Sequence, residues 1–157
     1  MRDRITLKKL MHHMLDSIDA VNGSCLKRVV AATLWDSGIG VTTGQVCYNG
    51  PTLSRLPICR YCKRVFQASD EGRSIMIVDC PSVHAETRVL IHPAAFQVDM
   101  NHQILVTTLF PCRDCMVLAI ERGVEAIAFH DTYYSDPEEE AKAGEMALQA
   151  GVKILLV

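Results

Sequence analysis

The sequence contains no long apolar run, no strong excess of one charge and no charged-then-apolar leader. None of its apolar stretches approaches the ~20 residues that a membrane-spanning helix needs. We therefore expect a soluble, cytoplasmic protein with no membrane partner. The formal net charge is −2 and the pI is about 6.3, so the chain lacks the electrostatic footprint of proteins that bind long nucleic acids. Any bound phosphate would need a local basic cluster.

Internal repeats, low-complexity tracts and linker-like stretches are also missing, so residues 1–157 are expected to form a single domain. Apolar residues make up 49% of the chain, which is enough for a continuous core and argues against disorder. The seven cysteines are an odd number in a chain without a leader. Thiolate ligands and buried thiols explain them better than a disulfide framework does.

Two short motifs carry metal-binding chemistry. His84 and Glu86 form a His-x-Glu motif, and Cys112 and Cys115, preceded by Pro111, form a Pro-Cys-x-x-Cys motif. One histidine and two cysteines can supply three ligands to a tetrahedral Zn²⁺ and leave the fourth position open for water, as in catalytic zinc sites. A Cys-x-x-Cys motif alone also occurs in structural zinc knuckles and redox proteins. A structural site, however, would not need Glu86 beside the ligands.

The periodicity of apolar residues predicts the order of the helices and strands. Alternating strands and helices from residue 104 onward require right-handed crossovers and a mainly parallel sheet, with an earlier hairpin pairing at one side. The expected fold is an α/β three-layer α/β/α sandwich around a five-stranded mixed sheet. In the first half of the chain we predict a helix over 7–18 stopped by 22–24, a hairpin of 28–35 and 39–48, a loop from 49 to 73 and a short extended segment over 74–78. A helix from 84, ended or interrupted near 93, comes next. The second half is predicted to contain a strand over 104–110, a helix over 112–122, a strand over 124–129, a helix from 136 to 151 and a strand over 153–157.

Four other cysteines are candidates for a second, structural zinc site. Cys59 and Cys62 lie in the predicted loop, and Cys80 comes after it. Loops of this length usually need something to hold them, and a Zn²⁺ bound by these three cysteines and Cys25 would contribute folding free energy directly. The alternative is that Cys59 and Cys62 are reduced surface thiols and Cys80 is buried. The remaining Cys47 is most simply a buried strand residue.

Taken together, the two metal-binding motifs match the signature of zinc-dependent nucleobase deaminases. His84 and Cys112 are expected at or near helix N-termini, which favour negative charge and therefore thiolates. Zn²⁺ lowers the pKa of bound water to roughly 7. Glu86 can then take the proton and pass it on. Attack at C4 of a cytosine requires protonation of N3 and later of the exocyclic amine, and one carboxyl can shuttle both protons.

Over nearly its whole length the chain resembles the deoxycytidylate (dCMP) deaminases of the cytidine deaminase superfamily. Besides the zinc motifs, the resemblance is carried by residues 24–28 (Ser-Cys-Leu-Lys-Arg), 48–51 (Tyr-Asn-Gly-Pro), 131–133 (Asp-Thr-Tyr) and 150–152 (Ala-Gly-Val). It implies a cytidine deaminase-like fold and a hydrolase that converts dCMP to dUMP with release of ammonia, supplying dUMP for thymidylate synthesis.

The resemblance also implies particular residue roles and regulators. Asn49 would contact the sugar of the nucleotide, and a cysteine matching Cys25 takes part in a second zinc site among relatives. Family members are commonly hexamers that dCTP activates and dTTP inhibits, and Mg²⁺ would accompany such an effector. The expected catalytic zinc ligands are His84, Cys112 and Cys115, the proton shuttle is Glu86, and the phosphate contacts are Lys27, Arg28 and Tyr133.

Two departures from the family pattern concern positions near these motifs. Relatives usually carry Asn where this chain has Arg88, and Gly where it has Ala31. We predict that Arg88 is an additional contact to a phosphate or an effector. The alternative is that it pairs with a carboxylate on the helix surface.

Several other functions stay open. One is the same chemistry on a free nucleoside, a modified cytosine nucleotide or adenosine in RNA, and another is a catalytically inert zinc module that serves as a scaffold. The low charge and the segments 48–50 and 131–133, typical of the mononucleotide branch, argue against RNA. The pair Lys27 and Arg28 argues against a free nucleoside, and the intact Glu86 argues against an inert module.

Overall fold

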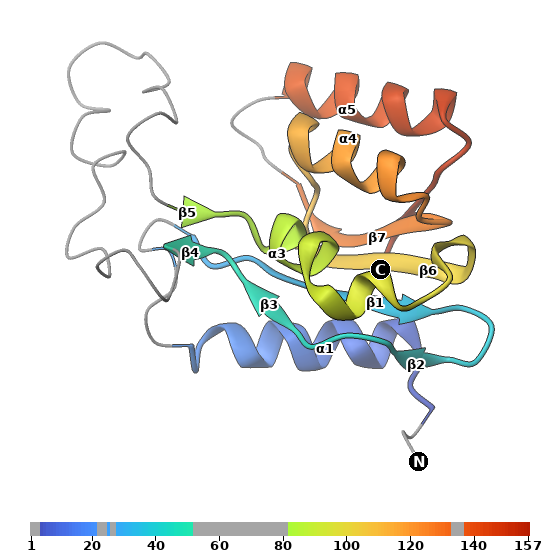
Figure 1. Ribbon diagram of the computed structural model, residues 1–157. Coiled ribbons are helices and arrows are strands. Elements are labelled where there is room, and N and C mark those ends of the chain that lie inside the picture. Colours follow the sequence, from blue (N-terminus) through green and yellow to red (C-terminus); the bar gives the residue numbers. More distant parts are fainter. Residues whose placement is uncertain (1–3, 22–24, 26–27, 52–81, 133–136) are drawn as a thin grey trace, which may run out of the picture.

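Strand β6 (Gln103–Leu109) lies at the centre of the sheet, and all seven of its residues are buried. Its sequence, QILVTTL, is an almost continuous run of apolar and β-branched residues, as expected for a strand covered on both faces. It pairs with β1 (Ala31–Asp36) in antiparallel and with β7 (Ala126–Asp131) in parallel orientation. The computed structural model describes residues 4–21, 25, 28–51, 82–132 and 137–157 (Figure 1).

The sheet has the strand order β2-β1-β6-β7-β8, and β3 pairs with β1 beside β2. Strands β2 (Val41–Thr42) and β3 (Cys47–Tyr48) pair with opposite ends of β1, so the single strand predicted over 39–48 is divided in two. Gly44 lies in the break, where a residue without a side chain weakens a strand. The predicted five-stranded mixed sheet is therefore confirmed, with one edge strand in two parts. Its last strand is β8 (Lys153–Leu156).

Helices cover both faces of the sheet, so the predicted three layers are confirmed (Figure 1). Successive side chains of β6 alternate between the two faces. Ile104 and Val106 pack with Met14 of the N-terminal helix α1, whereas Leu105 and Leu109 belong to the core on the other face. The helices are α1 (Leu7–Ile18) on one face and α3 (Ala85–Ile91), α4 (Arg113–Arg122) and α5 (Pro137–Gln149) on the other.

The helices end where local chemistry stops them. Helix α3 ends at Ile91 because Pro93 cannot continue an α-helix, and a short 3₁₀ turn over Pro93–Phe96 comes next. Helix α4 ends at Gly123, whose φ of 74° lies in the left-handed region that favours glycine. Both endings agree with the sequence prediction. Helix α1 runs from Leu7 to Ile18, as predicted, and the predicted stop signal at 22–24 lies outside the described residues.

A short ribbon leads into the first zinc motif. Strand β4 (Gly50–Pro51) pairs in antiparallel orientation with β5 (Ser82–Val83), which immediately precedes His84. Gly50 and Pro51 are buried, so the prediction that the loop begins at residue 49 is wrong for this pair. The rest of that loop and the segment predicted over 74–78 lie outside the described residues. No helix within the described ranges is both long and apolar enough to cross a membrane.

Candidate active site

Two helix N-termini bring the predicted ligands together. His84 is the N-cap residue of α3, and Cys112 is the N-cap residue of α4, just beyond the carboxyl end of β6. Pro111 separates that strand from the helix. Cys115 lies about one turn into α4 and is buried. Because α3 and α4 pack on the same face of the sheet, residues from two distant motifs meet, as the sequence predicts.

The three side chains form a compact donor set. The Nδ1 atom of His84 lies 3.3 Å from the Sγ atoms of both Cys112 and Cys115, and one ligand atom from each residue lies within 4.8 Å of the others. A tetrahedral Zn²⁺ with Zn–N of about 2.0 Å and Zn–S of about 2.3 Å requires N-to-S separations of about 3.5 Å. The residues therefore fit a three-ligand zinc site that keeps one coordination position open.

The two thiols differ in their acidity. A hydrogen bond from Cys115, together with the neighbouring imidazole of His84, lowers the pKa of Cys112 well below its ordinary value. The same partnership with Cys112, together with burial, raises the pKa of Cys115. Cys112 is therefore the thiol that ionises first. A divalent cation requires both thiols in the deprotonated form, so metal binding would release a proton from Cys115.

Glu86 lies beside this donor set and is only 4% exposed. Its Oε2 atom is 4.0 Å from Sγ of Cys115, and its Oε1 atom accepts a hydrogen bond of 3.3 Å from the hydroxyl of Thr107. Burial raises the pKa of Glu86 to about 7. A carboxyl with that pKa can both accept and donate a proton near neutral pH, which is the requirement for a general acid and base.

Two predicted substrate contacts lie at the same edge of the sheet, where β6 and β7 end and β1 begins. The Asn49 side chain accepts a 2.7 Å hydrogen bond from the N–H of Val30 and donates one of 2.9 Å to the carbonyl of Arg28. Arg28 is exposed, and its guanidinium lies 2.7 Å from the carboxylate of Asp131 at the end of β7. Ligands of open α/β sheets bind at such carboxyl ends. The contacts of Asn49 and Arg28 with a substrate stay predictions.

Arg88 adopts an arrangement that the sequence did not predict. Its half-buried guanidinium donates hydrogen bonds of 2.6 Å to the carbonyls of Gly50 and Pro51. In the described part of the chain its hydrogen-bond partners are these carbonyls of β4, and not a carboxylate on the helix surface. The bonds tie β4 to α3. A contact of Arg88 with a phosphate or an effector stays a prediction.

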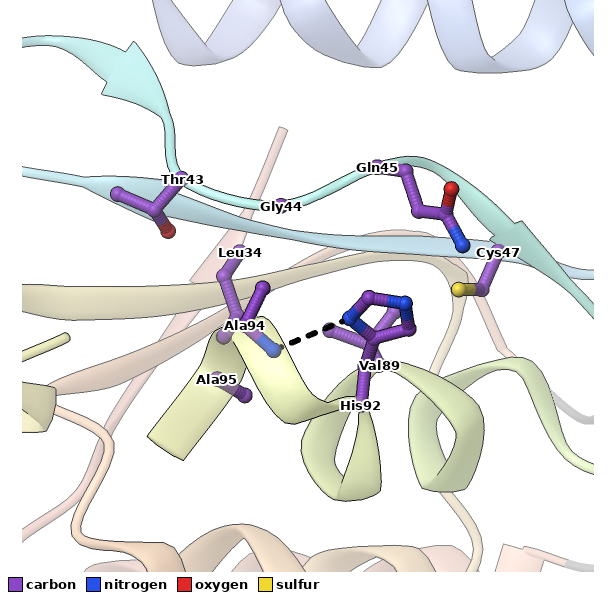
Figure 2. A pocket seen from close by; sticks show the side chains of 9 residues that line it. All are labelled: Leu34, Thr43, Gly44, Gln45, Cys47, Val89, His92, Ala94 and Ala95. Carbon is purple, nitrogen blue, oxygen red and sulfur yellow. Dashed lines mark hydrogen bonds between the residues drawn. The ribbon is translucent and has the colours of Figure 1, made fainter. Parts of the chain in front are cut away.

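The cysteines outside the donor set are only partly described. Cys25 is half-buried, and its N–H donates to the carbonyl of Asn49. Cys47 is buried in β3, as predicted, and lines a cavity of about 10 Å³ next to His92 (Figure 2). That cavity has room for about one water molecule and not for a nucleotide. The other residues with predicted roles, Cys59, Cys62, Cys80, Lys27 and Tyr133, lie outside the described residues.

Thr107 is the contact of Glu86 that sequence reasoning missed. It is fully buried in the middle of β6, where the pattern of the strand favours an apolar side chain. Two adjacent threonines, Thr107 and Thr108, interrupt the apolar run. A buried hydroxyl needs a hydrogen-bond partner, so this interruption was the available signal.

The fold is that of an α/β protein, and its donor set could hold a metal ion through three ligands. A family model described as the cytidine and deoxycytidylate deaminase zinc-binding region matches residues 5–131. The chain therefore belongs to this family, and the resemblance inferred from its motifs is confirmed. It is also similar to the deoxycytidylate deaminase of Schizosaccharomyces pombe, with 30% identity over 122 residues, which are 76% of this chain and 36% of that protein. The chain thus spans about a third of the length of this relative.

Solved structures share the fold at low sequence identity. The dCMP deaminase from the cyanophage S-TIM5, in complex with dCMP and dUMP, is similar with a TM-score of 0.65 and 17% identity, over 96% of this chain and 95% of that chain. A diaminohydroxyphosphoribosylaminopyrimidine deaminase/5-amino-6-(5-phosphoribosylamino)uracil reductase from Thermotoga maritima gives a TM-score of 0.61 and 14% identity, over 96% of this chain and 36% of that chain. These likenesses confirm the expected cytidine deaminase-like α/β fold.

The donor set makes a prediction about metal content. Replacing Cys112 by Ser should lower the zinc content by about one ion per chain, because one of three protein ligands is lost. Atomic emission on purified protein measures this directly. Cys47→Ala is the matched control, since Cys47 lies outside the donor set, and it should keep the full content. Equal zinc content in the Cys112→Ser and wild-type proteins would contradict the assignment.

The raised pKa of Glu86 predicts a pH dependence of the metal-free protein. Between its ordinary pKa of 4.5 and its folded-state pKa of about 7, the unfolded chain ionises this carboxyl while the folded chain does not. The free energy of unfolding therefore falls as pH rises through this window and levels off above it. Glu86→Gln removes this contribution, so its stability relative to the wild type should grow from pH 4.5 to pH 7.

Urea unfolding of both proteins after chelation, below and above this window, measures that difference. A stability difference that is the same at both ends of the window would show that the Glu86 carboxyl ionises as readily in the folded protein as in the unfolded chain.

Proposed function

We propose that this protein is a hydrolase that deaminates a cytosine mononucleotide, converting dCMP to dUMP with release of ammonia. The observation that carries the proposal is the buried Glu86 carboxyl beside the donor set of His84, Cys112 and Cys115. The names of the S. pombe relative and of the cyanophage structure support the same reaction. The product would supply thymidylate synthesis.

The donor set and Glu86 divide the chemistry between them. His84, Cys112 and Cys115 would hold Zn²⁺ through three ligands and leave one coordination position open. When bound, Zn²⁺ lowers the pKa of water to roughly 7 and so supplies a hydroxide nucleophile at neutral pH. Glu86 would accept a proton from the attacking water molecule. It then carries that proton to N3 of the cytosine ring, which makes C4 electrophilic.

The second half of the reaction uses the same carboxyl. After the C4–O bond has formed, Glu86 accepts the proton of the new hydroxyl and passes it to the exocyclic amine. The C4–N bond then breaks, ammonia leaves, and a carbonyl remains at C4. The exchange consumes one water molecule and leaves Glu86 in its starting state.

A mononucleotide is the substrate class that the rim of the site favours. Arg28 is exposed at the edge of the sheet, so a phosphate can share its guanidinium with the carboxylate of Asp131. Asn49 holds the backbone of residues 28–30 through its amide. That amide retains a second N–H and a second lone pair with which it can contact a sugar hydroxyl. Lys27, Tyr133 and Arg88 are proposed as further contacts near the phosphate.

The remaining properties are proposed from the resemblance. They are a hexameric assembly, activation by dCTP and inhibition by dTTP with Mg²⁺ bound to the effector, a second Zn²⁺ held by Cys25, Cys59, Cys62 and Cys80, and a cytoplasmic location.

The proposed reaction predicts a substrate order and a mutant effect. Ammonia release or the ultraviolet change on uracil formation should be fastest with dCMP when deoxycytidine and CMP are tested beside it. Glu86→Gln should keep its zinc while losing a factor of ~10² or more in turnover, because the positioned acid and base is gone. Turnover by zinc-loaded Glu86→Gln at the wild-type rate would contradict the proposal.

The proposed phosphate contact predicts a loss of activity that is confined to the nucleotide substrate. Arg28→Ala should raise KM for dCMP about tenfold or more, because a charge-assisted hydrogen bond is lost, and should leave turnover of deoxycytidine nearly unchanged. Lys142→Ala removes an exposed cation on α5 and serves as the matched control for net charge. Equal losses with dCMP and deoxycytidine would show that Arg28 acts on the structure of the site and not on the phosphate.

A further inference from the structure

The hydroxyl of Thr107 is shared between two acceptors. Its Oγ1 atom lies 3.0 Å from the carbonyl of Leu109 and 3.3 Å from Oε1 of Glu86. Thr107 itself is 0% exposed, so no bulk water competes for these bonds. A valine of similar size would satisfy the apolar pattern of β6 without burying a polar group. Packing of the strand therefore does not explain why residue 107 carries a hydroxyl that contacts Glu86.

The two oxygens of the Glu86 carboxyl have different neighbours. Oε1 faces the hydroxyl of Thr107, whereas Oε2 faces Sγ of Cys115 at 4.0 Å. A half-turn of the carboxyl about its last bond only exchanges two equivalent oxygens, whereas a smaller rotation breaks the bond to Thr107. The hydrogen bond thus selects the orientation in which one oxygen lies against the donor set.

The hydroxyl is itself anchored to the backbone that leads into α4. The carbonyl of Leu109 belongs to the last residue of β6, shortly before Cys112. Thr107 therefore links the carboxyl of Glu86 on α3 to the strand end that leads to two of the three ligands. A threonine hydroxyl has one proton to donate and two lone pairs. A protonated Glu86 carboxyl can donate to Oγ1 while Oγ1 donates to the carbonyl of Leu109, whereas an ionised carboxylate must share the single hydroxyl proton with that carbonyl.

We propose that Thr107 is a positioning residue for the reaction: its hydroxyl holds the Glu86 carboxyl with Oε2 toward the donor set. The expected effect of Thr107 on turnover rests on the proposed function, whereas the expected effect of Thr107 on the orientation of the Glu86 carboxyl does not. A purely structural role predicts a different outcome, in which the hydroxyl only satisfies the carbonyl of Leu109 and its removal lowers stability without a specific loss of turnover.

The neighbouring Thr108 provides a matched control. It is also buried, and its hydroxyl accepts a hydrogen bond of 3.0 Å from the N–H of Ala31 on β1. Thr108→Val therefore removes a buried hydroxyl from the same strand without touching Glu86. Thr107→Val removes the hydroxyl under test, and Thr107→Ser keeps it.

The kinetic experiment compares these three variants with the wild type, each loaded with zinc, using dCMP. Thr107→Val should lower kcat about fivefold to tenfold with KM nearly unchanged, as expected for one lost hydrogen bond to an acid and base. Thr107→Ser and Thr108→Val should stay within about twofold of the wild type. A kcat of Thr107→Val within about twofold of the wild type, or an equal loss in Thr107→Ser, would overturn the proposal. If Thr107→Val does not fold, Thr107→Ala takes its place against Thr107→Ser.

A crystallographic comparison of the same zinc-loaded variants gives a readout independent of activity. The Glu86 carboxyl should occupy one orientation in the wild type, Thr107→Ser and Thr108→Val, and should turn or split into two orientations in Thr107→Val. An unchanged carboxyl in Thr107→Val would overturn the proposal. If the wild type deaminates no cytosine nucleotide, the proposed function fails, and this comparison alone decides the role of Thr107.

Discussion

The approach of one imidazole nitrogen to two thiols is the constraint on which the candidate site depends. His84 and Cys112 occupy N-cap positions of two helices that begin at one edge of the sheet, and Cys115 lies in the first turns of α4. The first residues of both helices must lie close together for Nδ1 of His84 to be 3.3 Å from each sulfur. The two helices pack against each other, and α4 begins shortly after the buried central strand ends. The fold thus acts as a rigid frame for three ligand atoms.

Burial is the second physical ingredient of the site. The same α3 that begins at His84 places Glu86 in its first turn, against the interior of the protein. A helix N-terminus alone would favour the ionised carboxylate, but the loss of solvent outweighs it, and the pKa rises to about 7. His84 and Glu86 are separated by two positions in sequence, yet His84 is half-buried and Glu86 is buried. This division suits a site that must bind a cation and move protons.

Features of the fold and the site that depend on local patterns could be predicted from the sequence. The motif containing His84 and Glu86, the motif containing Cys112, and the periodicity of the strands and helices are all encoded within short segments. Motif spacing predicts which residues could bind a metal ion, and Pro93 and Gly123 mark helix ends through their own backbone preferences.

Features that the sequence could not predict depend on contacts between segments far apart in the chain. The guanidinium of Arg88 can donate hydrogen bonds to the carbonyls of β4 only because the ribbon of β4 and β5 folds beside α3. Thr107 meets Glu86 only because its side chain points to the face that α3 covers. Neither contact leaves a periodic trace in the sequence.

The most direct test of the proposed deamination is the fate of the oxygen atom that replaces the amine. Zinc-loaded protein would be incubated with dCMP in water labelled with heavy oxygen, and the nucleotide and ammonia would be measured by mass spectrometry and ammonia assay. We expect dUMP with one heavy oxygen at C4 and one ammonia for each dUMP formed. Recovery of unchanged dCMP from protein with a filled donor set would contradict the proposed reaction.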